Sequence, residues 1–126
     1  MKIVRRTPKS VYNIWIKALR SGKYEQTNGR LKTPAIHSEE YDSFCCLGVL
    51  CDLAATDGGE EWTDWGAYGE NYDTDLLPTH MRRYIKMRPS EQQRLVDLND
   101  GGASFNRIAN EIEKIRDKAI LRKSVL

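Results

Sequence analysis

The longest apolar stretch of the chain is Phe44-Cys-Cys-Leu-Gly-Val-Leu-Cys-Asp-Leu-Ala54. It is apolar nearly all round at helical spacing, as expected of a helix that is buried on most sides. It is much shorter than the ~20 apolar residues that a membrane-spanning helix needs. We therefore expect a central buried helix over residues 44–55. Within it, Gly48 predicts that another element passes close over its bare backbone.

The sequence around this stretch is typical of one globular domain. The chain has 126 residues, 40% of them hydrophobic and 30% charged, so we expect a single domain over residues 1–126 with a real core. The basic start lacks the apolar segment of a secretory signal. Together with three cysteines, an odd number, this predicts a reducing cytosol and free thiols.

All three cysteines fall in the apolar stretch, and their spacing argues against a metal site. On a helix, Cys45 and Cys46 lie roughly 120–140° from Cys51, so the thiols cannot converge on one tetrahedral zinc. Neither His37 nor His80 stands at a ligand spacing from them. We expect no metal or cofactor and predict buried, inert thiols, with a cysteine–histidine nucleophile as the weaker alternative.

Two amphipathic helices are expected to pack on the central helix. They cover Ser10–Arg20 and Ser104–Leu121, and in both the apolar residues recur every three or four positions. Ser10, Ser43 and Ser104 are predicted to cap the N-termini of the first, central and last helices. The apolar stripe of the last helix consists of Phe105, Ile108, Ala109, Ile112, Ile115 and Ala119.

The remaining segments predict short elements. We expect a hairpin over residues 24–32 with a turn at Thr27-Asn28-Gly29, then a loop to Asp42. Residues 60–75 predict one or two short strands or an ordered loop held by aromatic anchors. Short helices are expected from Leu77-Pro78 to about Met87, where Pro89 ends the first, and from a Ser90–Gln93 capping box to Leu98. The fold class is therefore α+β, a mainly helical single domain with a central buried helix and a small antiparallel hairpin or sheet.

The net charge of +2 hides a segregation along the chain. Counting Lys and Arg against Asp and Glu gives +8 for residues 1–32, −4 for 33–56, −7 for 57–75 and +5 for 76–126. One interpretation is that these segments pair with each other on a solvated surface. The other is a basic concavity for a phosphate-bearing partner, from which the acidic segment is excluded.

The sequence can be compared with the patterns of several known binding and catalytic sites. A calcium loop counted from Asp97 has Ile108 at the twelfth position, where a bidentate Glu is needed. A helix-turn-helix reading of residues 102–109 lacks a break before a second helix, and no glycine-rich phosphate loop of the Walker or Rossmann type is present. Carboxylate pairs such as Glu60 and Glu61 leave a small hydrolase as an alternative.

The remaining candidate functional residues are basic and aromatic side chains. Arginine forks bind phosphates bidentately and aromatic faces stack on bases. Our candidate ligand-binding residues are Arg20, Lys23, Tyr24, Arg82 and Arg83, with the arginines on phosphates and Tyr24 stacking. The alternative is that the cations are ordinary surface and that Trp15, Trp62 and Trp65 anchor the core.

The chain resembles a family of small proteins common in tailed-phage and prophage genomes. The resemblance lies in Trp15-x-x-Ala18-Leu19-Arg20-Ser21-Gly22-x-Tyr24-x-Gln26, in Cys45-Cys46-Leu47-Gly48-Val49-Leu50-Cys51-Asp52-Leu53, in Trp62 and Leu77-Pro78, and in Leu98-Asn99-Asp100-x-Gly102-x-Ser104-Phe105-x-x-Ile108-Ala109-x-x-Ile112. It spans residues 15–112 in a fixed order. It supplies no catalytic residues to carry over.

The resemblance implies a setting rather than a reaction. Small accessory phage proteins are made in the host cytoplasm, often to counter host defences. We therefore expect a non-enzymatic protein, a homo-oligomer without membrane contact, that sequesters a cyclic or other phosphate-bearing nucleotide used as an immune signal. The alternative is an inhibitor of a host defence protein that uses the acidic segment 57–75 as a mimic or mask.

Overall fold

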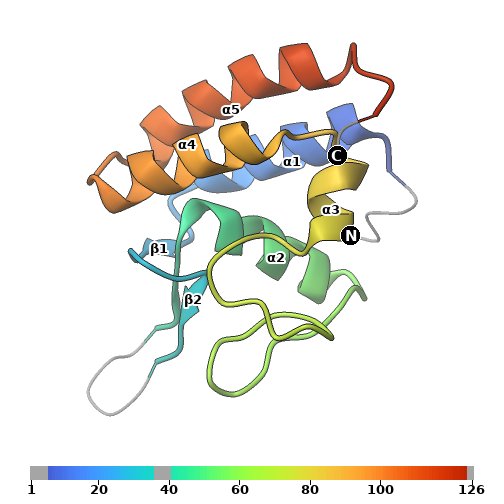
Figure 1. Ribbon diagram of the computed structural model, residues 1–126. Helices are drawn as coiled ribbons and strands as arrows, with labels where there is room; N and C mark the ends of the chain where they lie inside the picture. Colours follow the sequence, from blue (N-terminus) through green and yellow to red (C-terminus); the bar gives the residue numbers. More distant parts are fainter. Residues whose placement is uncertain (1–5, 36–40, 125–126) are drawn as a thin grey trace.

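The computed structural model describes residues 6–35 and 41–124 (Figure 1). Residues 36–40 of the loop expected before Asp42 therefore lie outside the described residues. In chain order the described elements are α1 (Pro8–Arg20), β1 (Glu25–Gln26), β2 (Lys32–Thr33), β3 (Ser43–Phe44), α2 (Cys46–Thr56), α3 (Thr79–Tyr84), α4 (Pro89–Asp100) and α5 (Phe105–Ala119). This is the predicted mainly helical α+β domain with a small sheet.

Helix α2 occupies the middle of the molecule, as its sequence predicts. Figure 1 shows α1, α4 and α5 on one side of it, and the short strands with the segment 57–75 on the other. Seven of its residues are buried: Cys46, Leu47, Gly48, Val49, Leu50, Cys51 and Ala54. An apolar segment flanked by charged ones has its lowest free energy where protein surrounds it, which explains its central position.

Of the two amphipathic helices expected to pack on the central helix, α1 does so and α5 packs mainly elsewhere. Helix α1 packs most extensively against α5, whereas α2 packs against α1 and α4. The apolar stripe of α5 is buried throughout, as predicted. Two long helices with matching stripes bury more apolar surface against each other than against the shorter α2, so α1 stands between α5 and α2.

The starts of the helices correct two of the predicted caps, the predicted capping box and the role of Pro89. Thr7, not Ser10, caps α1, with Pro8 in its first turn. Ser43 lies in β3, and the thiol of Cys45 accepts from the backbone N–H of Gly48 at 3.4 Å at the start of α2. Pro89 begins α4 rather than ending α3, because proline is well tolerated where the amide has no helical partner. The predicted Ser90–Gln93 capping box is wrong: the N–H of Arg88 donates to Glu91 Oε1 at 2.9 Å, so Glu91 rather than Gln93 supplies the side-chain acceptor at the start of α4. The cap predicted at Ser104 is confirmed.

The predicted hairpin over residues 24–32 is wrong. Strand β3 lies between the other two: it runs parallel to β1 and antiparallel to β2, with Lys32 opposite Phe44. The turn at Asn28 and Gly29 is therefore a crossover rather than a hairpin turn. Its backbone is held elsewhere, since the N–H of Gly29 donates to Asp100 Oδ1 at 2.9 Å.

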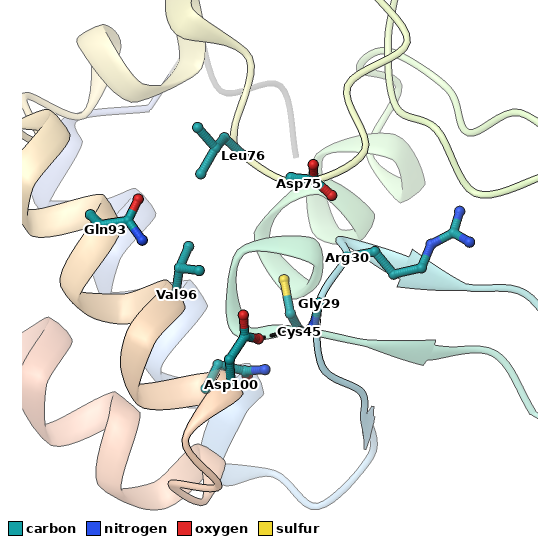
Figure 2. A pocket seen from close by; sticks show the side chains of 9 residues that line it. Gly29, Arg30, Cys45, Asp75, Leu76, Gln93, Val96 and Asp100 are labelled. Carbon is teal, nitrogen blue, oxygen red and sulfur yellow. Dashed lines mark hydrogen bonds between the residues drawn. The ribbon is translucent and has the colours of Figure 1, made fainter.

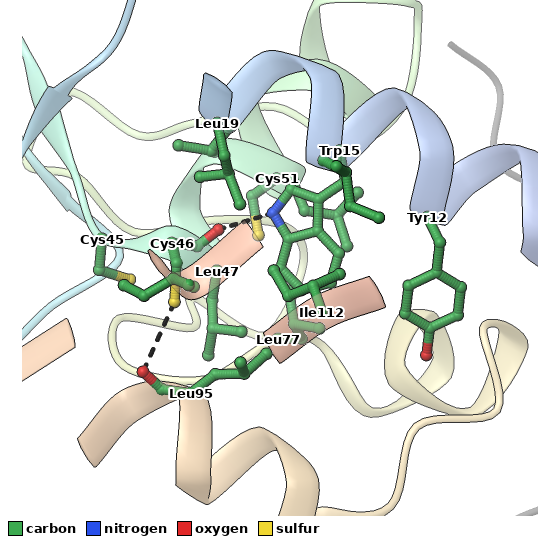
Figure 3. Close-up of a cluster of buried hydrophobic side chains, with 14 of the residues drawn as sticks. Tyr12, Trp15, Leu19, Cys45, Cys46, Leu47, Cys51, Leu77, Leu95 and Ile112 are labelled. Atoms are coloured by element: carbon green, nitrogen blue, oxygen red, sulfur yellow. Dashed lines mark hydrogen bonds between the residues drawn. The ribbon is translucent and has the colours of Figure 1, made fainter. Parts of the chain in front are cut away.

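The core joins the helices through hydrogen bonds as well as packing (Figure 3). The indole N–H of the fully buried Trp15 donates to the Cys46 carbonyl at 2.8 Å. The Cys46 thiol in turn donates to the Leu95 carbonyl at 3.7 Å, which links α2 to α4. All three cysteines are buried and free, as the sequence predicts.

The close approach predicted at Gly48 is confirmed. A β-carbon added there would lie 1.8 Å from the carbonyl oxygen of Leu31, which is backbone and cannot rotate away. That carbonyl accepts from the N–H of Cys45 at 3.1 Å. Glycine at this position therefore allows the chain before β2 to lie directly on α2.

A buried asparagine ties three elements together. Asn99, near the end of α4, accepts at Oδ1 from the N–H of Cys46 at 3.1 Å and from Gln26 Nε2 at 3.0 Å. Its Nδ2 donates to the Thr27 carbonyl at 2.7 Å. Because Asn99 is fully buried, these bonds fix how α4, α2 and the chain after β1 meet.

Residues 57–75 form an ordered loop, here called the acidic loop. Tyr68 makes isolated bridges to Trp62 and Asp73, in agreement with the expectation of a loop held by aromatic anchors. Trp62 and Tyr68 pack edge to face at 5.0 Å between ring centroids. Trp65 departs from the core-anchor interpretation, because 57% of it is exposed.

Candidate functional site

Lys23 and Tyr24, two of the five candidate ligand-binding residues, lie together beside the small sheet. With Glu25, Tyr41, Asp42 and Phe44 they line a hollow of about 410 Å³, here called the tyrosine hollow. That volume is within the range of small-molecule sites. Lys23 and Tyr41 are exposed, whereas Tyr24 is half-buried and Phe44 is buried.

A hydrogen bond and ring packing hold Tyr24 in place. Its hydroxyl donates to Asp52 Oδ2 at 2.9 Å, and the other carboxylate oxygen of Asp52 accepts from the indole N–H of Trp62 at 3.1 Å. The Tyr24 ring packs edge-on against Phe44 at 5.2 Å. Burial, and then the charge of Asp52, raise the pKa of Tyr24 far above its ordinary value. The phenol therefore stays neutral and cannot act as a base near neutral pH.

The charges at the tyrosine hollow nearly cancel. Lys32 lies 3.5 Å from Asp42, with its ammonium 5.7 Å from the centroid of the Phe44 ring and 5.0 Å from that of the Trp62 ring. Among the described residues, Lys23 and Glu25 are the other charged side chains that line the hollow, and both are exposed. Aromatic rings, one available cation and carboxylate acceptors are a set suited to a flat, hydroxylated ligand with little net charge.

Arg20 lies apart from this hollow. Its Nη2 donates to Glu113 Oε1 at 2.6 Å and to Asn110 Oδ1 at 2.7 Å, joining α1 to α5. It lines a separate shallow depression of about 500 Å³ between these helices, with Lys17 and Arg116. The guanidinium is thus already bound by a carboxylate of the same chain.

Arg82 and Arg83 lie on α3, on the opposite side of the molecule from β1 and β2 (Figure 1). The side chain of Arg82 is buried and donates from Nη1 to the Met87 carbonyl at 2.7 Å, so it supports the chain after α3. Arg83 is exposed. The structure therefore brings Lys23 and Tyr24 together and leaves the three arginines elsewhere.

A further hollow, of about 300 Å³, lies between α4 and residues 29–30 (Figure 2). Its polar lining includes the carboxylates of Asp75 and Asp100, the Cys45 thiol and the side chain of Gln93. Burial raises the pKa of the Cys45 thiol to about 11, so the thiol is protonated at neutral pH and is not a nucleophile. The two carboxylates make this hollow unfavourable for a phosphate.

Within the part of the chain that the structure describes, no group of three or more His, Cys, Asp or Glu side chains is placed to hold a metal ion. None of its helices is both long enough and apolar enough to cross a membrane.

The candidates chosen from the sequence leave out four residues that line the tyrosine hollow: Glu25, Tyr41, Asp42 and Phe44. Phe44 was assigned to the central helix, and Tyr41 stands in a polar segment without periodicity. The sequence signal for Tyr41 is a lone aromatic residue within a polar segment, because such a residue is often exposed. In the structure 68% of Tyr41 is exposed.

Residues 8–116 match a protein family described as Domain of unknown function (DUF8296). No curated protein and no solved structure matches the chain.

Proposed function

Since the chain belongs to the family described as Domain of unknown function (DUF8296), whose description assigns no activity, we propose a function from geometry: the protein binds a nucleotide-type ligand in the tyrosine hollow, without turnover. The observation that carries this proposal is the meeting of Lys23, Tyr24 and Tyr41 around one hollow beside the small sheet.

Each part of a nucleotide has a counterpart there. A base would stack on the exposed ring of Tyr41, since base–aromatic stacking contributes ~1–3 kcal/mol. The ammonium of Lys23 would bind a phosphate oxygen. The carboxylates of Glu25 and Asp42 would accept from ribose hydroxyls or base amino groups.

The charge at the hollow narrows the ligand class. Lys23 and Lys32 balance Glu25 and Asp42, so the site offers no excess of positive charge. Because the two lysines only balance the two carboxylates, little positive charge remains to attract the several negative charges of a triphosphate. Cyclic nucleotides, in which each phosphodiester carries one negative charge, fit this balance better.

The biological setting that we propose is counter-defence in the cytoplasm of a phage-infected host. By holding a cyclic nucleotide signal, the protein would lower the free concentration that reaches the host effector. Sequestration needs tight binding and no reaction. The Tyr24 phenol, kept neutral, and the protonated Cys45 thiol are compatible with such a passive role.

The test is calorimetry of the full chain with cyclic dinucleotides, cyclic trinucleotides, ADP-ribose, ATP and inorganic phosphate. We expect at least one cyclic nucleotide to bind with a micromolar or lower Kd, and ATP to bind more weakly. Tyr41→Ala removes the stacking ring without reaching the core, and we expect it to weaken binding about tenfold or more.

Lys23→Gln and Lys17→Gln form a matched pair for the charge. Both lysines are exposed, but Lys17 lines the separate α1–α5 depression. We expect Lys23→Gln to weaken nucleotide binding several-fold and Lys17→Gln to leave it unchanged. The proposal is wrong if no nucleotide gives heat at micromolar protein, or if binding survives Tyr41→Ala undiminished.

A further inference from the structure

The acidic loop carries two exposed aromatic rings that rest on each other. Trp65 is 57% and Tyr72 60% exposed, and their rings stack with centroids 6.2 Å apart and planes 23° from parallel. Large aromatic side chains are rarely left in water without a role, and Trp and Tyr dominate the binding energy of protein interfaces.

The backbone beneath these rings is fixed by hydrogen bonds. The Trp65 carbonyl accepts from Arg30 Nη2 at 2.6 Å. Tyr68 and Asp73 exchange backbone bonds at 2.7 and 3.0 Å, and the N–H of Tyr72 donates to the Gly69 carbonyl at 3.1 Å. A surface that is already ordered loses little conformational entropy when a partner binds.

Tyr72 also holds a strained backbone. Its φ of +52° is left-handed, a conformation that among the described non-glycine residues is shared only with Lys86. Such a conformation is uncommon for a residue with a β-carbon and persists where the surrounding structure holds it. In this loop it occurs at the residue whose ring stacks on Trp65.

The acids of the loop outnumber the cations that contact it. The Arg30 guanidinium donates to the Trp65 carbonyl, and the Arg6 guanidinium lies 4.0 Å from Asp57. Among the residues that the structure describes, no cation lies within ion-pair distance of four exposed acids of the loop, Glu61, Asp64, Glu70 and Asp75. By contrast, Arg20 and Arg94 are both paired with carboxylates of α5. Pairing between the charged segments of the chain therefore accounts for only part of the charge of this loop.

We propose that the acidic loop is a docking surface for a partner protein that presents an arginine- or lysine-rich face. A guanidinium or ammonium would lie over the exposed faces of Trp65 and Tyr72, where the ring quadrupole attracts a cation. The surrounding carboxylates would attract the basic face from a distance and pair with its other cations. Nucleic acid would be repelled by the same charges.

This surface is distinct from the tyrosine hollow, so the two proposals fail or hold separately. The test uses the full chain and a 12-residue peptide of alternating arginine and glycine, with a glutamate–glycine peptide as the charge-reversed control. At low salt we expect the basic peptide to bind with a blue shift or quenching of the Trp65 fluorescence. We expect the acidic peptide not to bind.

Tyr72→Gly is the decisive variant. Glycine adopts a left-handed φ without strain, so this substitution removes the ring and keeps the backbone conformation of the loop. We expect it to weaken calorimetric binding of the basic peptide about tenfold, and Trp65→Ala to do the same. Leu121→Ala, at an 84% exposed apolar position beyond α5, should leave binding unchanged.

Two further outcomes decide the proposal. Neutralising Asp64 and Glu70 as Asp64→Asn and Glu70→Gln should weaken binding and flatten its salt dependence. If the basic peptide does not bind, or binds equally well to Tyr72→Gly and Trp65→Ala, the proposal is overturned. It is also overturned if sedimentation shows that a second copy of the chain occupies this surface, with self-association lost in Tyr72→Gly.

Discussion

Trp15 and Trp65 carry the same side chain into opposite environments. Trp15 lies in α1 with no exposed surface, and its indole N–H is bound by the Cys46 carbonyl. Trp65 lies in the acidic loop with more than half of its surface exposed, stacked only on Tyr72. One indole is surrounded by helices, and the other is presented to solvent on a loop that the helices support.

The difference separates stability from recognition. Burying an aromatic side chain removes apolar surface from water and stabilises the fold, whereas an exposed one contributes little until something covers it. The buried aromatic side chains belong to α1 and α5, together with Phe44 and Tyr68. The exposed ones, Trp65, Tyr72 and Tyr41, lie on the acidic loop and at the tyrosine hollow.

The sharpest test of this contrast is truncation of both tryptophans. We expect Trp15→Ala to lower the free energy of unfolding by about 4 kcal/mol, because it leaves a large cavity and an unpaired Cys46 carbonyl. Trp65→Ala should change it by less than about 0.5 kcal/mol, as for an exposed position. Chemical denaturation followed by circular dichroism measures both. A large loss in Trp65→Ala would mean that the loop is part of the core.

A smaller loss of stability is expected when a methyl group is added at Gly48, where backbone already fills the space that it would take. In Gly48→Ala the added methyl would lie 1.8 Å from the Leu31 carbonyl oxygen, so α2 and the chain before β2 must separate. We expect a loss of about 3 kcal/mol in denaturation. Gly101→Ala is the matched control, since its methyl would meet backbone only at 3.0 Å and its φ is −81°. Equal losses in the two variants would show that the contact at Gly48 relaxes freely.

The parts that the sequence predicts well are those with local causes. Helical spacing of apolar residues located α1, α2 and α5, and the lack of a side chain at Gly48 indicated the close approach that the structure contains. The buried, unpaired cysteines follow from their position in an apolar run without ligand spacing. Each of these predictions depends on a few neighbouring residues.

The parts that it misses depend on distant partners. The pairing of β1 with β3 cannot be read from two-residue strands, because such strands carry no periodicity. Asn99 reads as a turn residue, yet it is a buried hub whose partners Gln26 and Thr27 are more than 70 positions away. The same limit applies to the candidate site. Lys23 and Tyr24 are neighbours in the sequence and line one hollow. Arg82 is predicted to bind the same ligand only because it is an arginine, and it lies on α3.

The smallest effect that we predict concerns pH and the interior of the acidic loop. Burial, and then the charge of Glu60, raise the pKa of Asp73, while His80 acts in the opposite direction. A carboxylate whose pKa is higher in the folded state binds protons more tightly there, so its ionisation destabilises the fold. That penalty is absent below the pKa of the unfolded chain and complete above the folded one. Asp73→Asn should therefore raise the free energy of unfolding by about 0.5 kcal/mol near pH 7.

The gain from Asp73→Asn should vanish near pH 3, where the carboxyl is protonated in both states. Denaturation midpoints of the two proteins at both pH values give the comparison, with Asp64→Asn, exposed on the same loop, as the matched control. We expect Asp64→Asn to give a smaller gain at neutral pH. If Asp73→Asn instead destabilises the protein at pH 7, then Asp73 supports the loop as an anion. The folding of the inner side of the acidic loop would then need negative charge, just as the proposed binding of a basic partner to its exposed aromatic face does.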